Sequence, residues 1–321
     1  MVETNVEGVK QAVSTGTLPG WDQVDSLVAA SHERNRACKD GAVADYIPVL
    51  AQADPNLFGV CVVEVDGGVH VAGEADAEFS IQSISKAFVY ALVCQDLGHA
   101  AMADLVGVNN TGLAFNSVMA IELNHGHPMN PMVNAGALAT TALMPGRTPD
   151  EQWAAIHSGL SAFAGRDLVL DQEVYRSEMG TNTRNRAIAR LLESYGRMGR
   201  DPLEVVDVYT KHCSLRVSAR DLAIMGATLA DGGVNPVTGQ RVVSAEVCRD
   251  TLAILASNGL YERSGEWLFE IGLPGKSGCP VDCSRSHLAK PESEPSPHGW
   301  TPQATACAAN KPRHIYPGCW D

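Results

Sequence analysis

Residues 79–88 read FSIQSISKAF and place a serine, Ser83, three positions before a lysine, Lys86, at the head of a long apolar run. On a helix, residues three apart lie on the same face, with Cβ atoms about 5–6 Å apart. A buried lysine loses its proton readily, and its neutral amine can then accept the proton of a serine hydroxyl. A lone Ser-x-x-Lys spacing is common and usually carries no function. The stretch therefore predicts a serine nucleophile activated by a lysine only if other motifs build a site around Ser83.

The composition limits the classes of protein and partner that the chain can represent. Its 321 residues are 45% apolar, enough for one large domain or two small ones. The net charge of −13 and the pI of about 5.2 argue against a nucleic acid or an anionic membrane as partner. No apolar run reaches the roughly 20 residues of a membrane span, and the first 25 residues lack a signal-peptide pattern. We therefore expect a cytoplasmic protein whose scattered cysteines are buried, reduced thiols.

The order of predicted elements indicates an α+β fold. We expect a strand over 58–65, a hairpin turn at 66–68 and a returning strand over 69–73. A buried helix over 79–97, which ends at Gly98, follows the hairpin. An antiparallel sheet covered by a central helix is an α+β layer arrangement.

The rest of the chain predicts mostly helices up to about residue 260. We expect new helices to begin at 148–151, at 182–186 and at 218–221. The second of these helices runs on to Tyr195, and the start of the third resembles a capping box. Residues 1–35 predict two short helices split at 16–20. Pro48 predicts an extended segment over 43–48, because it disfavours a helical predecessor.

Five stretches, in order along the chain, resemble the serine-dependent glutaminases. They are FSIQSISK (79–86), NPMVNAGA (130–137), EMGTNTRN (178–185), LADGGVNP (229–236) and GKSG (275–278). The resemblance extends from about residue 10 to residue 278. It implies a β-lactamase/transpeptidase-like fold, in which an antiparallel sheet is flanked by a mainly helical region. It also implies hydrolysis of free L-glutamine to L-glutamate and ammonia, no cofactor or metal, and a homo-oligomer (dimer or tetramer).

The resemblance also implies roles for individual residues. Ser83 would be the nucleophile, Lys86 its general base, and Tyr209 and Tyr261 the other catalytic residues. The positions that match the glutamine site are Tyr46, Ser83, Asn134, Glu178, Asn185, Tyr209, Tyr261, Ser277 and Cys279. Lys276, Ser277 and Gly278 match the strand motif that closes the site.

The chemistry of glutamine agrees with these residue types. Glu178 can pair with the substrate ammonium, and the amides of Asn134 and Asn185 can donate to its carboxylate. A tyrosine can pass a proton to the departing ammonia. The backbone N–H groups of Ser83 and, by the resemblance, Cys279 would stabilise the tetrahedral oxyanion.

Each of these residues also has a simpler interpretation. Glu178 could be an ordinary acid near a helix start, Asn134 a turn residue in an Asn-Ala-Gly sequence, and the two tyrosines core aromatics. His125 and His127 are spaced like a pair of metal ligands. A surface loop before Pro128 is the interpretation that we favour, because no carboxylate or cysteine at ligand spacing completes such a site.

The resemblance stops after Gly278, where a different composition begins. Residues 279–321 hold seven of the 17 prolines and four of the nine cysteines, and the prolines argue against central strands and a long helix. We interpret 1–278 as a single glutaminase domain and 279–321 as an anomalous, frame-shifted tail that is not native-like. A naturally divergent tail is the alternative. Loss of the C-terminal strands and helix would leave apolar faces and sheet edges exposed, and would make the chain unstable and weakly active.

Three functions remain open from the sequence. The first is a glutaminase. The second is a β-lactamase- or transpeptidase-like acyl hydrolase, which shares the Ser–Lys pair. The third is an inactive remnant that persists as a subunit or binding partner.

Overall fold

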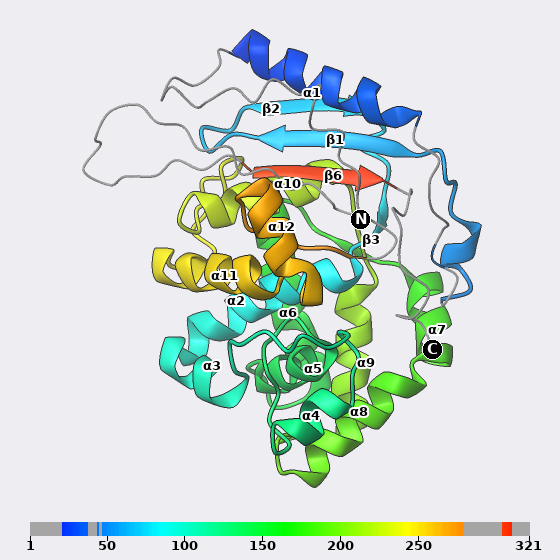
Figure 1. Cartoon of the computed structure of the whole chain (residues 1–321), viewed down its shortest axis with the longest axis vertical. Helices are drawn as coiled ribbons and strands as arrows, with labels where there is room; N and C mark the ends of the chain where they lie inside the picture. Colours follow the sequence, from blue (N-terminus) through cyan, green and yellow to red (C-terminus); the bar gives the residue numbers. More distant parts are fainter. Residues whose placement is uncertain (1–20, 38–43, 45–46, 279–303, 310–321) are drawn as a thin grey trace.

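The computed structural model describes residues 21–37, 44, 47–278 and 304–309, and these form a layer with a β-sheet and a larger helical region (Figure 1). In Figure 1, helix α1 (Trp21–Arg36) lies above the sheet and α10 (Ala219–Ala230) lies below it. The described residues thus have the α+β architecture that the sequence predicts.

The first sheet has the strand order β2-β1-β6 and is antiparallel throughout. Its central strand β1 (Phe58–Val63) is buried at all six positions, because both of its faces are covered. Phe58, Val60 and Val62 pack with α1, whereas Cys61 and Val63 belong to the main core. This alternation follows from the two-residue period of a strand. The hairpin to β2 (Val69–Gly73) forms as predicted, although β1 ends two residues earlier than expected.

The third strand of this sheet comes from the far end of the chain. Strand β6 (Ala304–Ala309) pairs with β1 from Phe58↔Ala309 to Val63↔Ala304. The expectation that the C-terminal strands are all missing is therefore wrong for this segment. The sequence clue is a proline-free interval between Pro302 and Pro312, at the edge of the sheet, where one strand can still form.

A second, smaller sheet leads into the stretch around Ser83. Its strand order is β3-β5-β4. The strands are β3 (Phe79–Ser80), β5 (Leu215–Val217) and β4 (Val169–Leu170). The prediction of one helix over 79–97 is therefore only partly right. The chain leaves β3 through a 3₁₀ turn, η3 (Gln82–Ile84), and the α-helix α2 runs from Ser85 to Leu97, with Gly98 as its C-cap.

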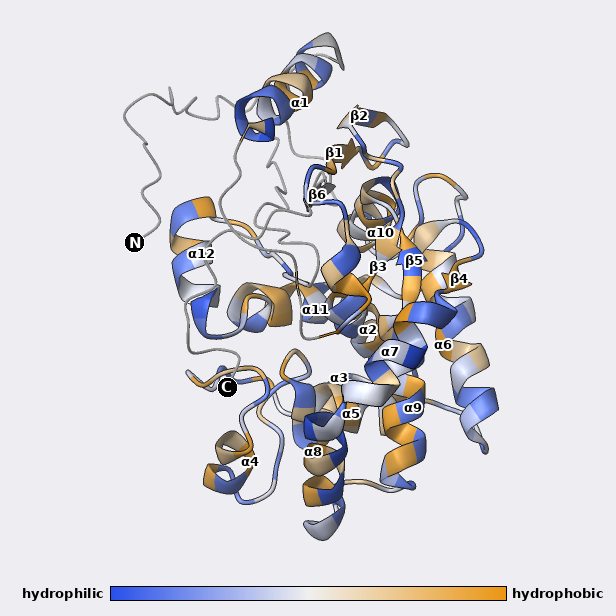
Figure 2. Ribbon diagram, turned by 90° about the vertical axis from the view of Figure 1, so that its right-hand side faces the viewer, coloured by the Kyte–Doolittle hydropathy of each residue, from blue (hydrophilic) through white to orange (hydrophobic). Residues whose placement is uncertain are grey.

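The helical region contains the three helix starts that the sequence predicts, together with helices for which no bounds were predicted. Its helices are α3 (His99–Leu105), α4 (Met119–Leu123), α5 (Asn134–Leu143), α6 (Pro149–Ala164), α7 (Gln172–Thr181), α8 (Thr183–Ser194), α9 (Pro202–Cys213), α11 (Ala245–Asn258) and α12 (Ser264–Ile271). Thr148 caps α6, α8 begins after Asn182, and Ser218 with Asp221 forms the capping box of α10. Hydrophobic residues run along β1, β5 and α9 (Figure 2).

Two other predictions have different outcomes. Pro48 and Val49 lie in a turn that leads into the 3₁₀ helix η2 (Leu50–Gln52), so the extended-segment prediction is wrong at this end. The first of the two N-terminal helices lies outside the described residues, and the second is α1. Among the described helices, none has the length and apolarity to cross a bilayer.

Candidate active site

Ser83 lies in the middle of η3, at the point where the small sheet passes into α2. Its side chain is half-buried, and its hydroxyl makes no hydrogen bond to another described residue. The residue before it, Gln82, has a φ of 48°, a left-handed conformation that costs a non-glycine residue about 1–2 kcal/mol. The backbone N–H of Ser83 lies in the first turn of η3, where N–H groups lack helical partners. Within the described part of the chain, the turn therefore leaves both the hydroxyl and the N–H available.

Lys86 is a fully buried lysine in the first turn of α2, with 2% of its surface exposed. Its Nζ donates to the Met132 carbonyl at 3.1 Å and to Asn134 Oδ1 at 2.7 Å. Burial lowers its pKa to about 8, against the raising effects of Cys213 and Glu178. The expected Ser83–Lys86 hydrogen bond is not formed here. Catalytic hydrogen bonds often form only once a substrate is bound.

Three aromatic rings surround the Lys86 ammonium. Its Nζ lies 5.8, 6.0 and 5.6 Å from the ring centroids of Phe115, Tyr209 and Tyr261. The rings exclude water and therefore favour the neutral amine, while their π faces keep a weak attraction for the cation. Tyr209 is itself buried on α9, which raises its pKa well above the ordinary value.

Asn134 begins α5 and links Lys86 to the helix α8. Its Oδ1 accepts from Lys86, and its Nδ2 donates to Asn185 Oδ1 at 2.9 Å. Asn134 therefore starts a helix and does not lie in the turn that the simpler interpretation assumed. The start of α5 can pack closely against the backbone of Asn130 because Gly136 has no side chain. A Cβ at Gly136 would lie 1.8 Å from the Asn130 carbonyl oxygen.

Glu178 is a buried carboxyl on α7 with an oxygen, Oε2, that has no hydrogen-bond partner among the described residues. Burial raises its pKa to about 7, although a hydrogen bond with Gln82 and the charge of Lys86 act in the opposite direction. It lies inside the protein at the end of the second turn of α7, so the helix-start interpretation is wrong. A buried carboxyl without a full set of partners is a hallmark of a ligand site.

Tyr261 and Lys276 form a pair beside these residues. Lys276 Nζ donates to Tyr261 Oη at 3.1 Å and lies 4.4 Å from the ring centroid. The Tyr261 ring packs against Phe115 at 5.0 Å, and its φ of 56° is a second left-handed conformation at the site.

The segment around Ser277 passes next to the turn that carries Ser83. A Cβ at Gly278 would lie 2.7 Å from Ile84 Cγ1, so the backbone of this segment touches the residue after Ser83. Ser277 is half-buried, and its N–H donates to the Gly259 carbonyl at 3.4 Å. Two of the predicted site residues, Tyr46 and Cys279, lie outside the described residues.

The structure thus brings together residues that lie up to 178 positions apart in the sequence, from Ser83 to Tyr261. Ser83, Lys86, Asn134, Glu178, Asn185, Tyr209 and Tyr261 all belong to one connected neighbourhood. Sequence reasoning missed Gln82, whose side chain reaches Glu178, and Phe115, which packs on Tyr261. The position of Gln82 directly before Ser83 could have identified it as a site residue. No motif in the sequence around Phe115 indicated that this residue belongs to the site.

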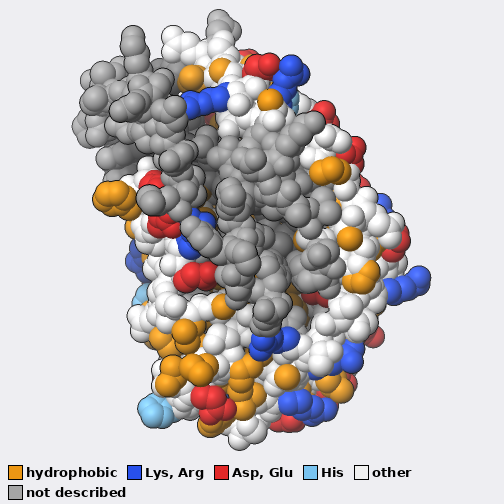
Figure 3. Space-filling model, turned by 45° about the vertical axis from the view of Figure 1, so that its right-hand side comes forward, with side chains coloured by type: hydrophobic (Ala, Val, Ile, Leu, Met, Phe, Trp, Pro, Cys, Tyr) orange, Lys and Arg blue, Asp and Glu red, His pale blue; other side chains and the backbone are white. Residues whose placement is uncertain are grey.

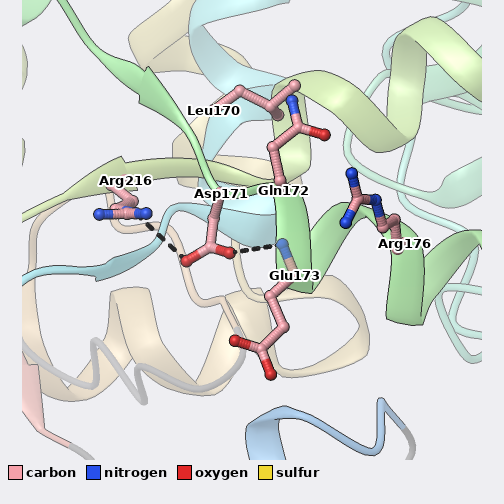
Figure 4. A pocket seen from close by; sticks show the side chains of 6 residues that line it. All are labelled: Leu170, Asp171, Gln172, Glu173, Arg176 and Arg216. Atoms are coloured by element: carbon pink, nitrogen blue, oxygen red, sulfur yellow. Dashed lines mark hydrogen bonds and ion pairs between the residues drawn. The ribbon is translucent and has the colours of Figure 1, made fainter.

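A separate surface cavity of about 460 Å³ lies at the start of α7 (Figure 4). It is lined by Leu170, Asp171, Gln172, Glu173, Arg176 and Arg216. Asp171 caps α7 and pairs with Arg216 at 3.3 Å, so its carboxylate is already used. None of the predicted site residues lines this cavity.

His125 and His127, which are spaced like a pair of metal ligands, lie in the loop before Pro128 that the sequence favours. Within the described ranges, no group of three His, Cys, Asp or Glu side chains could hold a metal ion. His127 instead contacts the Pro128 and Asp104 carbonyls, as expected for a loop residue.

The fold and site define a class of protein: an α+β chain in which a serine precedes a buried lysine at the start of the central helix. The Glutaminase family model matches residues 41–280, and the chain belongs to this family. It is 54% identical over 271 residues to "Glutaminase 2" of Yersinia pestis, a match that covers 84% of this chain and 80% of that protein. It is 50% identical over 255 residues to a glutaminase of Brucella canis, covering 78% and 80% of the two chains.

Solved structures agree with the sequence matches. The "probable glutaminase ybaS" superposes with a TM-score of 0.84 at 39% identity and covers 92% of this chain and 91% of its own. Mglu in its glutamate form superposes with a TM-score of 0.81 at 35% identity, covering 91% of this chain and 64% of that one. These neighbours have the β-lactamase-like fold, which is therefore the fold of this chain.

Proposed function

We propose that the protein hydrolyses the side-chain amide of L-glutamine to L-glutamate and ammonia. The observation that carries the proposal is the buried Lys86, whose pKa is lowered to about 8. It follows by three residues a Ser83 hydroxyl that bonds to no other described residue. Family membership and the 54% identity to a glutaminase support the choice of substrate. The orphan oxygen of Glu178 supports recognition of an ammonium group.

In the proposed mechanism, the neutral Lys86 amine takes the proton of Ser83 Oγ as the oxygen attacks the amide carbon. A tetrahedral intermediate forms, and its oxyanion accepts hydrogen bonds from backbone N–H groups, with Ser83 and Cys279 as the donors. The C–N bond breaks, and ammonia leaves with a proton that Lys86 returns through a tyrosine, Tyr209 or Tyr261. Water then attacks the glutamyl-serine ester and gives a proton to Lys86. Lys86 returns this proton to Ser83 Oγ as the ester C–O bond breaks, and glutamate is released.

The first two proposed substrate contacts use groups that either lack a partner among the described residues or can exchange the one they have. Glu178 pairs with the substrate ammonium, which removes the energetic penalty of its unpartnered oxygen. The Asn134 and Asn185 amides, now bonded to each other at 2.9 Å, turn to the substrate carboxylate. Tyr46 and Ser277 complete the set of proposed contacts. Tyr261, held by Lys276, would close the remaining side.

The test is the release of ammonia and glutamate from L-glutamine by the purified full-length chain, with Ser83→Ala as the blank. Release that depends on Ser83 supports the proposal. Covalent labelling by penicillin with no ammonia release would instead indicate a β-lactamase- or transpeptidase-like acyl hydrolase. Equal background from both chains would indicate an inactive remnant.

Glu178 gives a prediction for stability as a function of pH. Its folded pKa of about 7 exceeds the ordinary 4.5, so the folded state binds the proton more tightly than the unfolded state. The stabilising contribution is fully present below about pH 4.5 and is lost as the pH rises through about 7. Glu178→Gln should remove this loss and be more stable than the parent at pH 8 by up to about 3 kcal/mol, but not at pH 5.

Urea unfolding at the two pH values measures the effect of Glu178→Gln. Glu173→Gln, at an exposed position on the same helix, is the matched control and should change stability little at either pH. If Glu178→Gln and Glu173→Gln respond to pH alike, the buried carboxyl is not the cause. Ammonia release by Glu178→Gln should fall sharply, mainly through a raised KM.

We further propose that 1–278 is the glutaminase domain and that the tail at 279–321 is frame-shifted and, apart from strand β6, not native-like. The family match that ends at residue 280 supports this boundary, and so do the matches that cover only about 80% of the relatives. The tail should make the chain less stable and less active than a family member. A hybrid with the C-terminal region of the Yersinia pestis relative after Gly278 should unfold at a higher temperature and turn over faster. Equal Tm and kcat would contradict the proposal.

We also infer a homo-oligomer, dimer or tetramer, and a cytoplasmic location. Exposed apolar side chains support association: Met119 and Leu123 on α4 and Phe269 on α12 are 62%, 70% and 91% exposed. Figure 3 shows apolar side chains gathered at the lower end of one face. Free, buried thiols at Cys61, Cys94, Cys213 and Cys248 support a reducing compartment. Sedimentation of the purified chain tests the first inference, and fractionation of cells that express it tests the second.

A further inference from the structure

A buried polar cluster contacts the nucleophile turn through the Gln82 carbonyl. Its members are Ser85, Thr141, His212 and Cys213, and each has at most 2% of its surface exposed. They come from three helices, α2, α5 and α9, and the proposed mechanism uses none of them. Burying a polar group is unfavourable unless it is hydrogen-bonded, so the hydrogen bonds of the buried histidine have to be identified.

The distances in this cluster select one arrangement of protons. Ser85 Oγ lies 2.7 Å from the Gln82 carbonyl oxygen and 2.8 Å from His212 Nδ1. The contact on the other side of the ring, from Nε2 to Thr141 Oγ1, is longer, at 3.3 Å, and the Thr141 hydroxyl already reaches the Ala137 carbonyl at 2.8 Å. If Nδ1 carried no proton, Nδ1 and the Gln82 carbonyl would compete for the single Ser85 hydrogen. With the proton on Nδ1, both short contacts are satisfied.

The ring carries only one proton, which makes this choice meaningful. Burial lowers the pKa of His212 to about 3, and the nearby Lys86 acts in the same direction. The neutral ring therefore has one donor and one acceptor nitrogen. Tyr209 packs edge-on against the ring at 5.0 Å and fixes its plane.

We infer that His212, protonated at Nδ1, donates to Ser85 Oγ, and that Ser85 donates to the Gln82 carbonyl. This series of two hydrogen bonds positions Ser83. The carbonyl belongs to the left-handed residue immediately before the nucleophile, and that conformation persists only where its surroundings hold it. Held there, Gln82 also directs its side chain to Glu178. Ser85 and His212 are thus positioning residues, and the kinetic part of the inference rests on the proposed glutaminase activity.

The first arm of the test is kinetic. Ser85→Ala and His212→Phe should each lower kcat for glutamine by roughly 10- to 100-fold with little change in KM, because the nucleophile is misplaced while the binding groups remain. The double variant should be no worse than the more damaging single variant, since both break the same chain. His212→Asn, whose amide N–H can take the Nδ1 position, should recover most of the lost kcat.

A matched control separates positioning from a general loss of stability. Thr251 on α11 is equally buried, and its hydroxyl also bonds a backbone carbonyl, that of Val247 at 2.8 Å. Thr251→Val should lower Tm about as much as Ser85→Ala and leave kcat unchanged. If Ser85→Ala lowers Tm but not kcat, or if the two single effects multiply in the double variant, the inference is wrong.

The second arm does not depend on activity. Long-range ¹H–¹⁵N spectra of the full chain, labelled at histidine, report the protonated ring nitrogen, and His212→Phe identifies the signal. We expect the neutral Nδ1–H form at neutral pH and a shift of the Nδ1 resonance in Ser85→Ala. An Nε2–H form overturns the inference. A chain that shows the Nδ1–H form but releases no ammonia would refute the proposed function and leave the hydrogen-bond chain in place.

Discussion

Replacement of Ser83 by alanine is expected to reduce ammonia release from glutamine by roughly 10⁴- to 10⁶-fold, the loss seen when a covalent nucleophile is removed. Without the Ser83 oxygen, no glutamyl ester can form. The residual rate reflects only binding and oxyanion stabilisation. A coupled assay for ammonia, with glutamate measured in parallel, detects the change. Because both products are followed, a contaminating activity that consumes glutamine by another route is recognised.

The Ser83→Ala chain should fold as well as its parent. The Ser83 hydroxyl makes no hydrogen bond to another described residue, so its removal leaves no group unsatisfied there. Ser194→Ala, at an exposed hydroxyl on α8, is a control that should change neither activity nor Tm. A Ser83→Ala chain that keeps more than a small fraction of the parent's rate would exclude Ser83 as the nucleophile.

Replacement of Lys86 by methionine is the second large expected effect, a loss of about 10³-fold or more in kcat. Methionine fills a similar space but cannot accept a proton. Lys86→Arg keeps the positive charge and has no accessible neutral form, so it should be nearly as inactive. This pair separates the base from the charge: substantial activity in Lys86→Arg would show that only the charge matters.

The Lys86 variants also test how kcat depends on pH and how Lys86 affects the stability of the fold. The parent's kcat should rise with pH up to about 8, because the lysine serves as a base only once its proton has left. The residual activity of Lys86→Met should lack this rise of kcat with pH. Stability should change little in Lys86→Met: the Met132 and Asn134 oxygens lose a donor, but a buried charge is also removed.

Local signals allowed much of the fold to be predicted. Thr148 before a proline and two acids, and Ser218 with Asp221, marked helix starts because a cap is a contact within one turn of the chain. The hairpin between β1 and β2 was equally local. The helix predicted over 79–97 began too early, because the pairing of Phe79 with Val217 draws the chain into a strand. That pairing joins segments far apart in the sequence.

The candidate site could be predicted as a set of residues but not as a geometry. The motifs named Lys86, Asn134 and Glu178, yet the Lys86–Asn134 bond and the unpartnered Glu178 oxygen depend on how three helices pack. The left-handed Gln82 could not be foreseen, because glutamine has no preference for that conformation. Its cause lies in contacts from α2 and, through His212, from α9.

The pairing of β1 with β6 has a consequence for the timing of synthesis. Phe58 is made about 250 residues before its partner Ala309. At about 5–20 residues per second, the ribosome needs roughly 10–50 s to cover that distance. Throughout that interval the open side of β1 is a template for strands of neighbouring nascent chains. Slower initiation or a chaperone that shields β1 should therefore raise the yield of folded protein more than any change near Ser83.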